Sequence, residues 1–386
     1  MPSAFKNGGL IFGIIGTVLV GLICTHCVHI LVVCSQVLAE RLKVPSLGFA
    51  ETAEAAFKTG PRPLRKFSTA AWIFVQVALF ATYYLGNTVY VVFMANSLMQ
   101  VLGGNGVPLD VRVCILIVAV PLLPLGSVRS LRYLVPFSAI ATVLIIVGLV
   151  MTLYFTLSDL PDISQRNNVV APVHWPLFFS TVLFAMEGIG TVLPIENSMK
   201  TPGHFLGCPG VLNIAMTVVV VLYALVGFCG YWQFGEETLG SITLNLKNTW
   251  FADSVKIIVA LSILFTYGLQ FTVPTEIVWK RLGKVINEKR HTLGYYSMRL
   301  LMILGTVIIA IIVPQLGPII SLVGAVCLSI LGLFCPAIID SVTRYETGYG
   351  FLKWSLVKNI VIAVLSIIAL VSGAYSSIIE IIEAYS

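Results

Sequence analysis

The chain has 386 residues, of which 58% are hydrophobic and only 10% are charged. Soluble domains are about 45 to 50% apolar and about 25% charged, and a single core stops growing beyond roughly 250 to 300 residues. These values exclude an ordinary soluble protein, so much of the apolar surface must face a lipid bilayer. The net charge of +6 comes from basic residues at the ends of apolar stretches, without a nucleic-acid-binding motif, and it does not indicate nucleic acid as a partner.

Long stretches without Asp, Glu, Lys or Arg predict the membrane spans, because about 20 apolar helical residues cross the hydrocarbon core of a bilayer. They are continuous blocks rich in Ile, Leu and Val, which favours helices over the alternating pattern of a β-barrel. The eighth is about twice as long as one span and contains Pro314 and Pro318, so it predicts two helices. The sequence thus predicts an all-α, polytopic membrane protein with ten spans in a single domain over residues 1–386. The stretches cover residues 7–39, 67–109, 113–128, 133–158, 167–186, 201–235, 257–275, 300–339 and 359–379.

The charges between the spans predict the orientation, because Lys and Arg collect in short cytoplasmic loops. Basic residues follow the first, third, fifth and seventh stretches and precede the last, whereas the opposite connections are mostly acidic. Residues 45–60 combine apolar and acidic side chains at helical spacing, which predicts an amphipathic helix on the cytoplasmic side. In this orientation the first complete span begins outside, although no earlier span precedes it. We therefore expect a parent protein of eleven spans, whose first span is largely missing from this chain.

The most informative segment surrounds Glu187, which lies inside an apolar stretch. Gly188, Gly190 and Pro194 follow it closely and make a continuous helix costly. A carboxylate at the centre of a span costs about 2.5 to 3.5 kcal/mol on insertion scales, so we expect Glu187 to face protein or water. An interrupted helix of this kind offers backbone N–H groups to a carboxylate and C=O groups to an ammonium group or cation. The alternative is close packing of small residues, with Glu187 capping a neighbouring helix.

A second interruption is expected five spans earlier if the fold is an inverted repeat, and residues 2–9 occupy that place. Taken together, these features resemble the amino acid/auxin permease family, and within it the proton-coupled amino acid transporters. The resemblance covers nearly the whole chain. Residues 1–9 are similar to the end of the family's first interrupted helix, residues 25–29 to a histidine motif in its second span, and residues 187–200 to the signature of its sixth span.

The resemblance implies two inverted repeats of five helices plus an extra C-terminal helix, with interrupted first and sixth helices. It also implies symport of small neutral amino acids, such as alanine, glycine and proline, with protons. The substrate is then expected at the two interruptions. The implied substrate-binding residues are Pro2, Ser3, Ala4, Tyr84, Phe184, Glu187, Gly188 and Gly190, and further polar candidates are Tyr83, Asn87, Tyr267 and Gln270.

The resemblance also implies two proton-coupling residues, His26 and Glu187. An unperturbed imidazole titrates near pH 6.5, which suits a gradient from acidic to neutral pH. The alternative for His26 is a buried neutral histidine bonded to a backbone carbonyl, and for His29, on a different helical face, this is the favoured interpretation. Glu196 and Lys200 are four residues apart, which favours an ion pair at the surface over an inner gate.

Several other functions lack support in the sequence. It contains no P-loop for ATP-driven pumping and no HExxH or GxSxG motif, so the chain is not expected to be an enzyme. Nothing points to a metal or organic cofactor, and the eight cysteines are expected to be buried apolar side chains. A secondary active transporter of the plasma membrane or the lysosomal membrane is the leading hypothesis. The alternative is an amino-acid-sensing membrane scaffold with little net flux.

Overall fold

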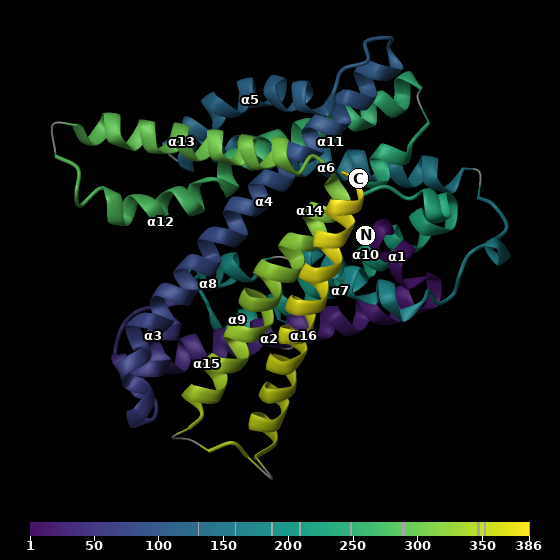
Figure 1. Ribbon diagram of the computed structural model, residues 1–386. Helices are drawn as coiled ribbons and strands as arrows, with labels where there is room; N and C mark the ends of the chain where they lie inside the picture. Colours follow the sequence, from purple (N-terminus) through teal and green to yellow (C-terminus); the bar gives the residue numbers. More distant parts are fainter. Residues whose placement is uncertain are drawn as a thin grey trace.

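The computed structural model describes residues 1–129, 131–158, 160–186, 188–207, 210–247, 249–287, 290–345, 348–350 and 353–385, with residues 131 and 132 described by their backbone alone. This part of the chain is mostly helical and contains no strand (Figure 1). The α-helices are α1 (Pro2–Gly8), α2 (Leu10–Leu42), α3 (Phe49–Thr59), α4 (Ser68–Gly104), α5 (Val111–Ser127), α6 (Leu131–Leu157), α7 (Trp175–Ala185), α8 (Ile189–Ser198), α9 (Gly203–Leu206), α10 (Val211–Phe234), α11 (Trp250–Gln270), α12 (Thr272–Leu282), α13 (His291–Ile312), α14 (Leu316–Val323), α15 (Cys335–Thr343) and α16 (Trp354–Glu383). A π-helix, η7 (Gly324–Phe334), joins α14 to α15.

The helices confirm the predicted membrane architecture. Nine helical segments in the described part of the chain are long and apolar enough to cross a bilayer. The remaining predicted span forms α5, an apolar helix of 17 residues, which is at the lower limit for crossing the hydrocarbon core. The chain is thus an integral, multi-pass membrane protein.

The ends of the helices follow local backbone chemistry. The stretch predicted to contain two helices does so, because α13 ends at Ile312 and α14 begins at Leu316, with Pro314 between them. Gly9 separates α1 from α2 at a φ of 96°, a left-handed conformation that only glycine adopts without strain. α1 is therefore a short helix of its own, as the second half of an interrupted helix would be.

The predicted amphipathic helix in residues 45–60 is confirmed as α3. Ala50, Ala53 and Ala56 are buried, and the cluster that contains them includes side chains of α2 and α15. Glu51 and Lys58 are exposed on the other side of the helix. α3 lies at the lower left of Figure 1, against the start of α4.

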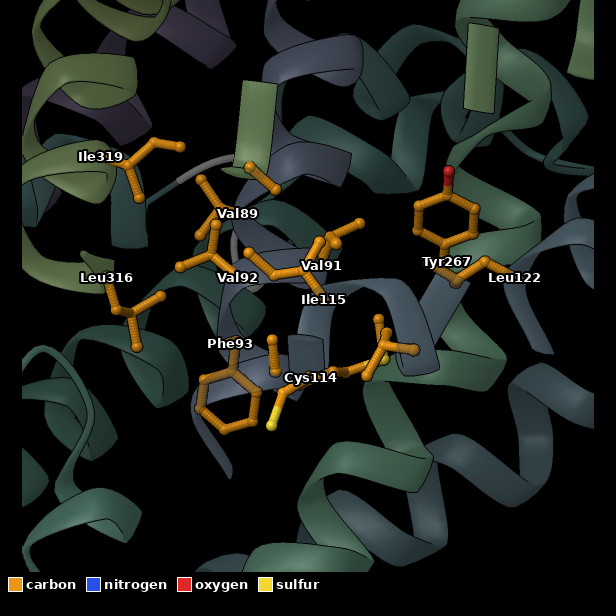
Figure 2. Packing of buried hydrophobic residues seen from close by; sticks show 14 of the residues in the cluster. Val89, Val91, Val92, Phe93, Cys114, Ile115, Leu122, Tyr267, Leu316 and Ile319 are labelled. Carbon is orange, nitrogen blue, oxygen red and sulfur yellow. The ribbon is translucent and has the colours of Figure 1, made fainter. Parts of the chain in front are cut away.

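The largest apolar cluster joins α4, α5, α11, α13 and α14. Figure 2 shows Val91 and Val92 of α4 between Ile115 of α5 and Ile319 of α14, with Tyr267 of α11 at one end. By contrast, α6 presents apolar side chains outward, since Val143, Ile146 and Val150 are 61%, 55% and 62% exposed. Rows of exposed aliphatic side chains of this kind are stable only against lipid.

Candidate functional site

The two interruptions predicted from the sequence lie together. α1 packs against α7 and α10. Ala4 of α1 is fully buried and belongs to one apolar cluster with Val182 and Leu183 of the last turn of α7 and with Met186, which follows that helix. Pro2 is also buried, against α10, and Ser3 is half-buried. The end of α7 is therefore in contact with α1, where the substrate site is expected.

The second interruption separates α7 from α8. α7 ends at Ala185, and α8 begins at Ile189 after Gly188, which has a φ of 157°. The carbonyl oxygen of Gly188 accepts hydrogen bonds from Thr191, 3.0 Å from its backbone nitrogen and 2.8 Å from its Oγ1. Glu187, predicted for both substrate binding and proton coupling, lies outside the described residues. Its roles therefore stay predictions.

A cavity of about 210 Å³ lies beside this interruption. α2, α7, α8, α10 and η7 all contribute to its walls. Met186, Gly188 and Ile189 line it at the interruption itself, and Val192 and Ile195 continue the wall along α8. The lining is apolar, so polar recognition at this place falls to the backbone groups at the ends of α7 and α8.

The remaining predicted substrate residues lie at different distances from the interruption. Phe184 is half-buried in the last turn of α7, beside Gly324 of η7. Gly190 lies in the first turn of α8, where an added Cβ would lie 2.6 Å from the hydroxyl of Tyr83. Tyr84 is directed elsewhere, because its hydroxyl donates to the carbonyl of Met302 in α13 at 2.9 Å.

The resemblance implies Tyr84 as a substrate-binding residue and leaves Tyr83 as a further candidate, whereas Tyr83 is the one that contacts α8. Adjacent residues of a helix point about 100° apart, so only one of the pair can face α8, and the sequence does not say which. Among the further candidates, Tyr267 is buried and shares a hydrogen bond with Thr306 at 3.3 Å. Asn87 donates to the carbonyl of Tyr83 at 2.7 Å, and its Oδ1 is buried without a hydrogen-bond partner.

His26 lies on α2, which contacts α7, α8, α10, α15 and η7. Its Nε2 atom is buried and has no hydrogen-bond partner among the described residues. The expected alternative, a histidine held by a backbone carbonyl, is therefore not seen at this nitrogen. The charged side chains near enough to act on the imidazole electrostatically include Asp340, Arg344 and Lys358.

The surface ion pair predicted between Glu196 and Lys200 is wrong. Glu196 is only 3% exposed, and its Oε1 accepts a hydrogen bond from Nε2 of Gln36 in α2 at 2.9 Å. Lys200 lies beyond the end of α8 and is exposed. The helical spacing of the two residues does not bring them together, because α8 ends at Ser198 and its inner face packs against α2.

Within the described ranges, no group of His, Cys, Asp and Glu side chains could hold a metal ion. The cysteines that the structure describes are free thiols, and all but Cys229 are buried. The six buried ones lie in the apolar clusters, as predicted, although the thiol of Cys34 also donates a hydrogen bond to Asp340.

Comparison with known proteins identifies the family. The family model described as "Transmembrane amino acid transporter protein" matches residues 1–379. The "Proton-coupled amino acid transporter-like protein pathetic" of Drosophila melanogaster is 42% identical over 391 residues, an alignment that covers 100% of this chain and 82% of that protein. The "Amino acid transporter ANT1" of Arabidopsis thaliana is 25% identical over 405 residues, which cover 99% of this chain and 88% of the plant protein. The family and the relatives are transporters, so the chain is a transporter homologue and not an enzyme. The chain belongs to the transmembrane amino acid transporter family.

Proposed function

We propose that the chain carries small neutral amino acids, such as alanine, glycine and proline, together with protons. The observation that carries this proposal is the packing of α1 against the interrupted helix α7–α8. α2, which also packs against α7 and α8, carries His26, whose buried Nε2 has no hydrogen-bond partner among the described residues. A buried polar atom without a partner costs free energy, and such atoms are retained where they serve a function.

The ends of the two half-helices support an amino-acid substrate. The last carbonyl groups of α7 have no partner further along the helix, and they attract an ammonium group. The first N–H groups of α8 likewise attract a carboxylate. The 210 Å³ cavity beside Gly188 is apolar, which suits a small uncharged side chain. One site thus offers a complementary surface to each part of a neutral amino acid.

Proton coupling is proposed to use His26 and Glu187. A proton taken up on the acidic side neutralises or charges these groups together with substrate binding, and its release on the neutral side completes the cycle. The plasma membrane and the lysosomal membrane both carry a proton gradient that could drive such a cycle.

The test is uptake of labelled alanine, glycine and proline by cells that express the chain, at acidic and neutral external pH, after delivery to the cell surface has been confirmed. Acid-stimulated uptake is expected, and uptake equal to that of untransfected cells would contradict the proposal. Purified protein that binds labelled alanine but carries none into liposomes would instead favour the sensing scaffold.

A further inference from the structure

Buried carboxylates in a membrane protein need an explanation, because burial of a charge is costly unless a cation or hydrogen bonds compensate it. The described part of the chain has three of them, Glu196, Asp253 and Asp340, which are 3%, 9% and 0% exposed. Two have a cation at hand. Nζ of Lys256 lies 3.6 Å from Oδ1 of Asp253, and Nε of Arg344 lies 2.7 Å from Oδ1 of Asp340.

Asp340 is also satisfied by neutral donors from two other helices. Nδ2 of Asn359 in α16 donates to its Oδ2 at 2.8 Å, and the thiol of Cys34 in α2 lies 3.4 Å from its Oδ1. One cation and two further donors thus compensate the charge of this carboxylate. Asp340 is therefore a structural link between α2, α15 and α16.

Glu196 differs from both of these residues. Its described partner is the neutral amide of Gln36, and no described cation lies within 4.0 Å of it. It also lies in the last turn of α8, where the carbonyl dipoles of the helix oppose a negative charge. Protonation would remove the uncompensated charge. Gln36 fits that form as well, since an amide can donate to a carboxyl group and also accept from it.

The position of Glu196 connects the interruption with the predicted cytoplasmic side. Val192 lines the cavity beside Gly188, and Glu196 follows it one turn later on the same side of α8. The next residue, Asn197, is exposed and donates to the carbonyl of Leu47 at 3.0 Å, in the connection that leads to α3. Glu196 thus lies between the cavity and the inner surface.

We propose that Glu196 carries the coupled proton through the inner half of the transport pathway. This inference rests on the proposed proton symport. The carboxylate takes up a proton on the side of the interruption and stays neutral while it is covered by Gln36. When α8 moves away from α2, the carboxyl group is hydrated and releases the proton to cytoplasmic water. The ionised carboxylate, which accepts a hydrogen bond from the Gln36 amide, returns with α8 to its place against α2 and there accepts the next proton from the side of the interruption, so that each movement cycle of α8 carries one proton inward.

The elements packed most closely against α8 are α2 and η7, and Tyr83 of α4 and the carbonyl of Leu47 also contact it. No cation on them has a described contact with Glu196. The titratable or charged side chains of α2, α4 and η7 are Cys24, His26, Cys27, His29, Cys34, Glu40, Arg41, Tyr83, Tyr84, Tyr90 and Cys327.

The experiment compares the unsubstituted chain with Glu196→Gln in liposomes, using labelled alanine. Two quantities are measured: accumulation driven by an inward proton gradient, and exchange of internal for external alanine at equal pH. Because an amide mimics the neutral carboxyl group, Glu196→Gln is expected to fold and to keep alanine exchange. It is expected to lose the accumulation of alanine that the proton gradient drives. Exchange by this variant should also lose its pH dependence. Glu196→Asp, which still titrates, should keep part of the accumulation.

Glu40→Gln is the matched control, because Glu40 is an exposed carboxylate at the end of α2. Alanine accumulation by this variant should equal that of the unsubstituted chain. Undiminished accumulation by Glu196→Gln would overturn the inference while leaving the proposed symport intact. Loss of alanine exchange as well, or failure of Glu196→Gln to fold, would also overturn it, because either result means that the ionised group is needed for structure or binding. Absence of proton-driven accumulation by the unsubstituted chain would overturn the proposed symport and this inference together.

Discussion

At the residue scale, the two histidines of α2 differ in their surroundings. Nε2 of His26 is buried without a partner in the described part of the chain, although an unpaired buried polar atom costs about 1 to 3 kcal/mol. His29, one turn further along α2, is half-buried. Unlike Nε2 of His26, its Nε2 is not left both buried and without a partner. The two histidines are therefore expected to differ in function.

His26→Gln is expected to abolish the stimulation of alanine uptake by external acid, because an amide cannot take up a proton in this pH range. Uptake at acidic and neutral external pH, corrected for the amount of protein at the surface, measures the effect. His29→Gln is the matched control and should keep the acid stimulation. Full acid stimulation in His26→Gln would exclude His26 from coupling.

Among the elements, η7 is the most unusual, because π-helical segments are rare and occur often at functional sites. Its first residue, Gly324, lies directly against the backbone of Ser180 in α7, and Gly373 of α16 lies against the side chains of Ser180 and Ala325. Small residues of this kind let helices in a membrane approach closely. η7 thus holds α7, the helix that ends at the interruption, against α16.

Gly324→Ala is expected to destabilise the protein by about 1 to 3 kcal/mol, because the added methyl group would overlap the carbonyl oxygen of Ser180. Thermal unfolding of the purified protein in detergent measures the change. Gly332→Ala provides a control in the same π-helix, since a Cβ at Gly332 would meet no atom within 4 Å. Equal melting temperatures for Gly324→Ala and the unsubstituted chain would contradict the close contact.

At the scale of the whole molecule, the distribution of charges predicts the orientation in the membrane. The segments on both sides of α3 and the connection that follows α12 carry basic residues, and together with α3 they are predicted to be cytoplasmic. The connection between α6 and α7 is predicted to lie outside. There it contacts the start of α2, because the backbone N–H of Leu10 donates to the carbonyl of Asn167 at 3.0 Å.

The orientation can be tested with single added cysteines, because the described native cysteines are mostly buried. Ser164→Cys, at an exposed position between α6 and α7, is expected to react with a membrane-impermeant maleimide on intact cells. Lys58→Cys, exposed on α3, should react only after the cells are made permeable. The reverse labelling pattern would show that the predicted orientation is inverted.

Much of the architecture could be predicted from the sequence, because lipid imposes a simple rule: apolar segments of about 20 residues form helices that satisfy their own backbone. This rule located the spans, the division of a long stretch at Pro314, and the interruption near Gly188. The amphipathic pattern likewise predicted α3. These features depend on local composition and backbone chemistry, which are readable residue by residue.

Only the tertiary structure decided which side chains meet. Tyr83 rather than Tyr84 reaches α8, and Glu196 is paired with Gln36, 160 residues away in the chain, rather than with Lys200 nearby. Helical spacing identifies neighbours on one helix, but the rotation of each helix about its axis is set by packing against the others. Lipid-facing and protein-facing sides of these helices are both apolar, so the sequence holds little information on that rotation. The family and the spans thus followed from the sequence by itself, whereas the burial of Glu196 against the neutral amide of Gln36 emerged only when α8 was packed on α2.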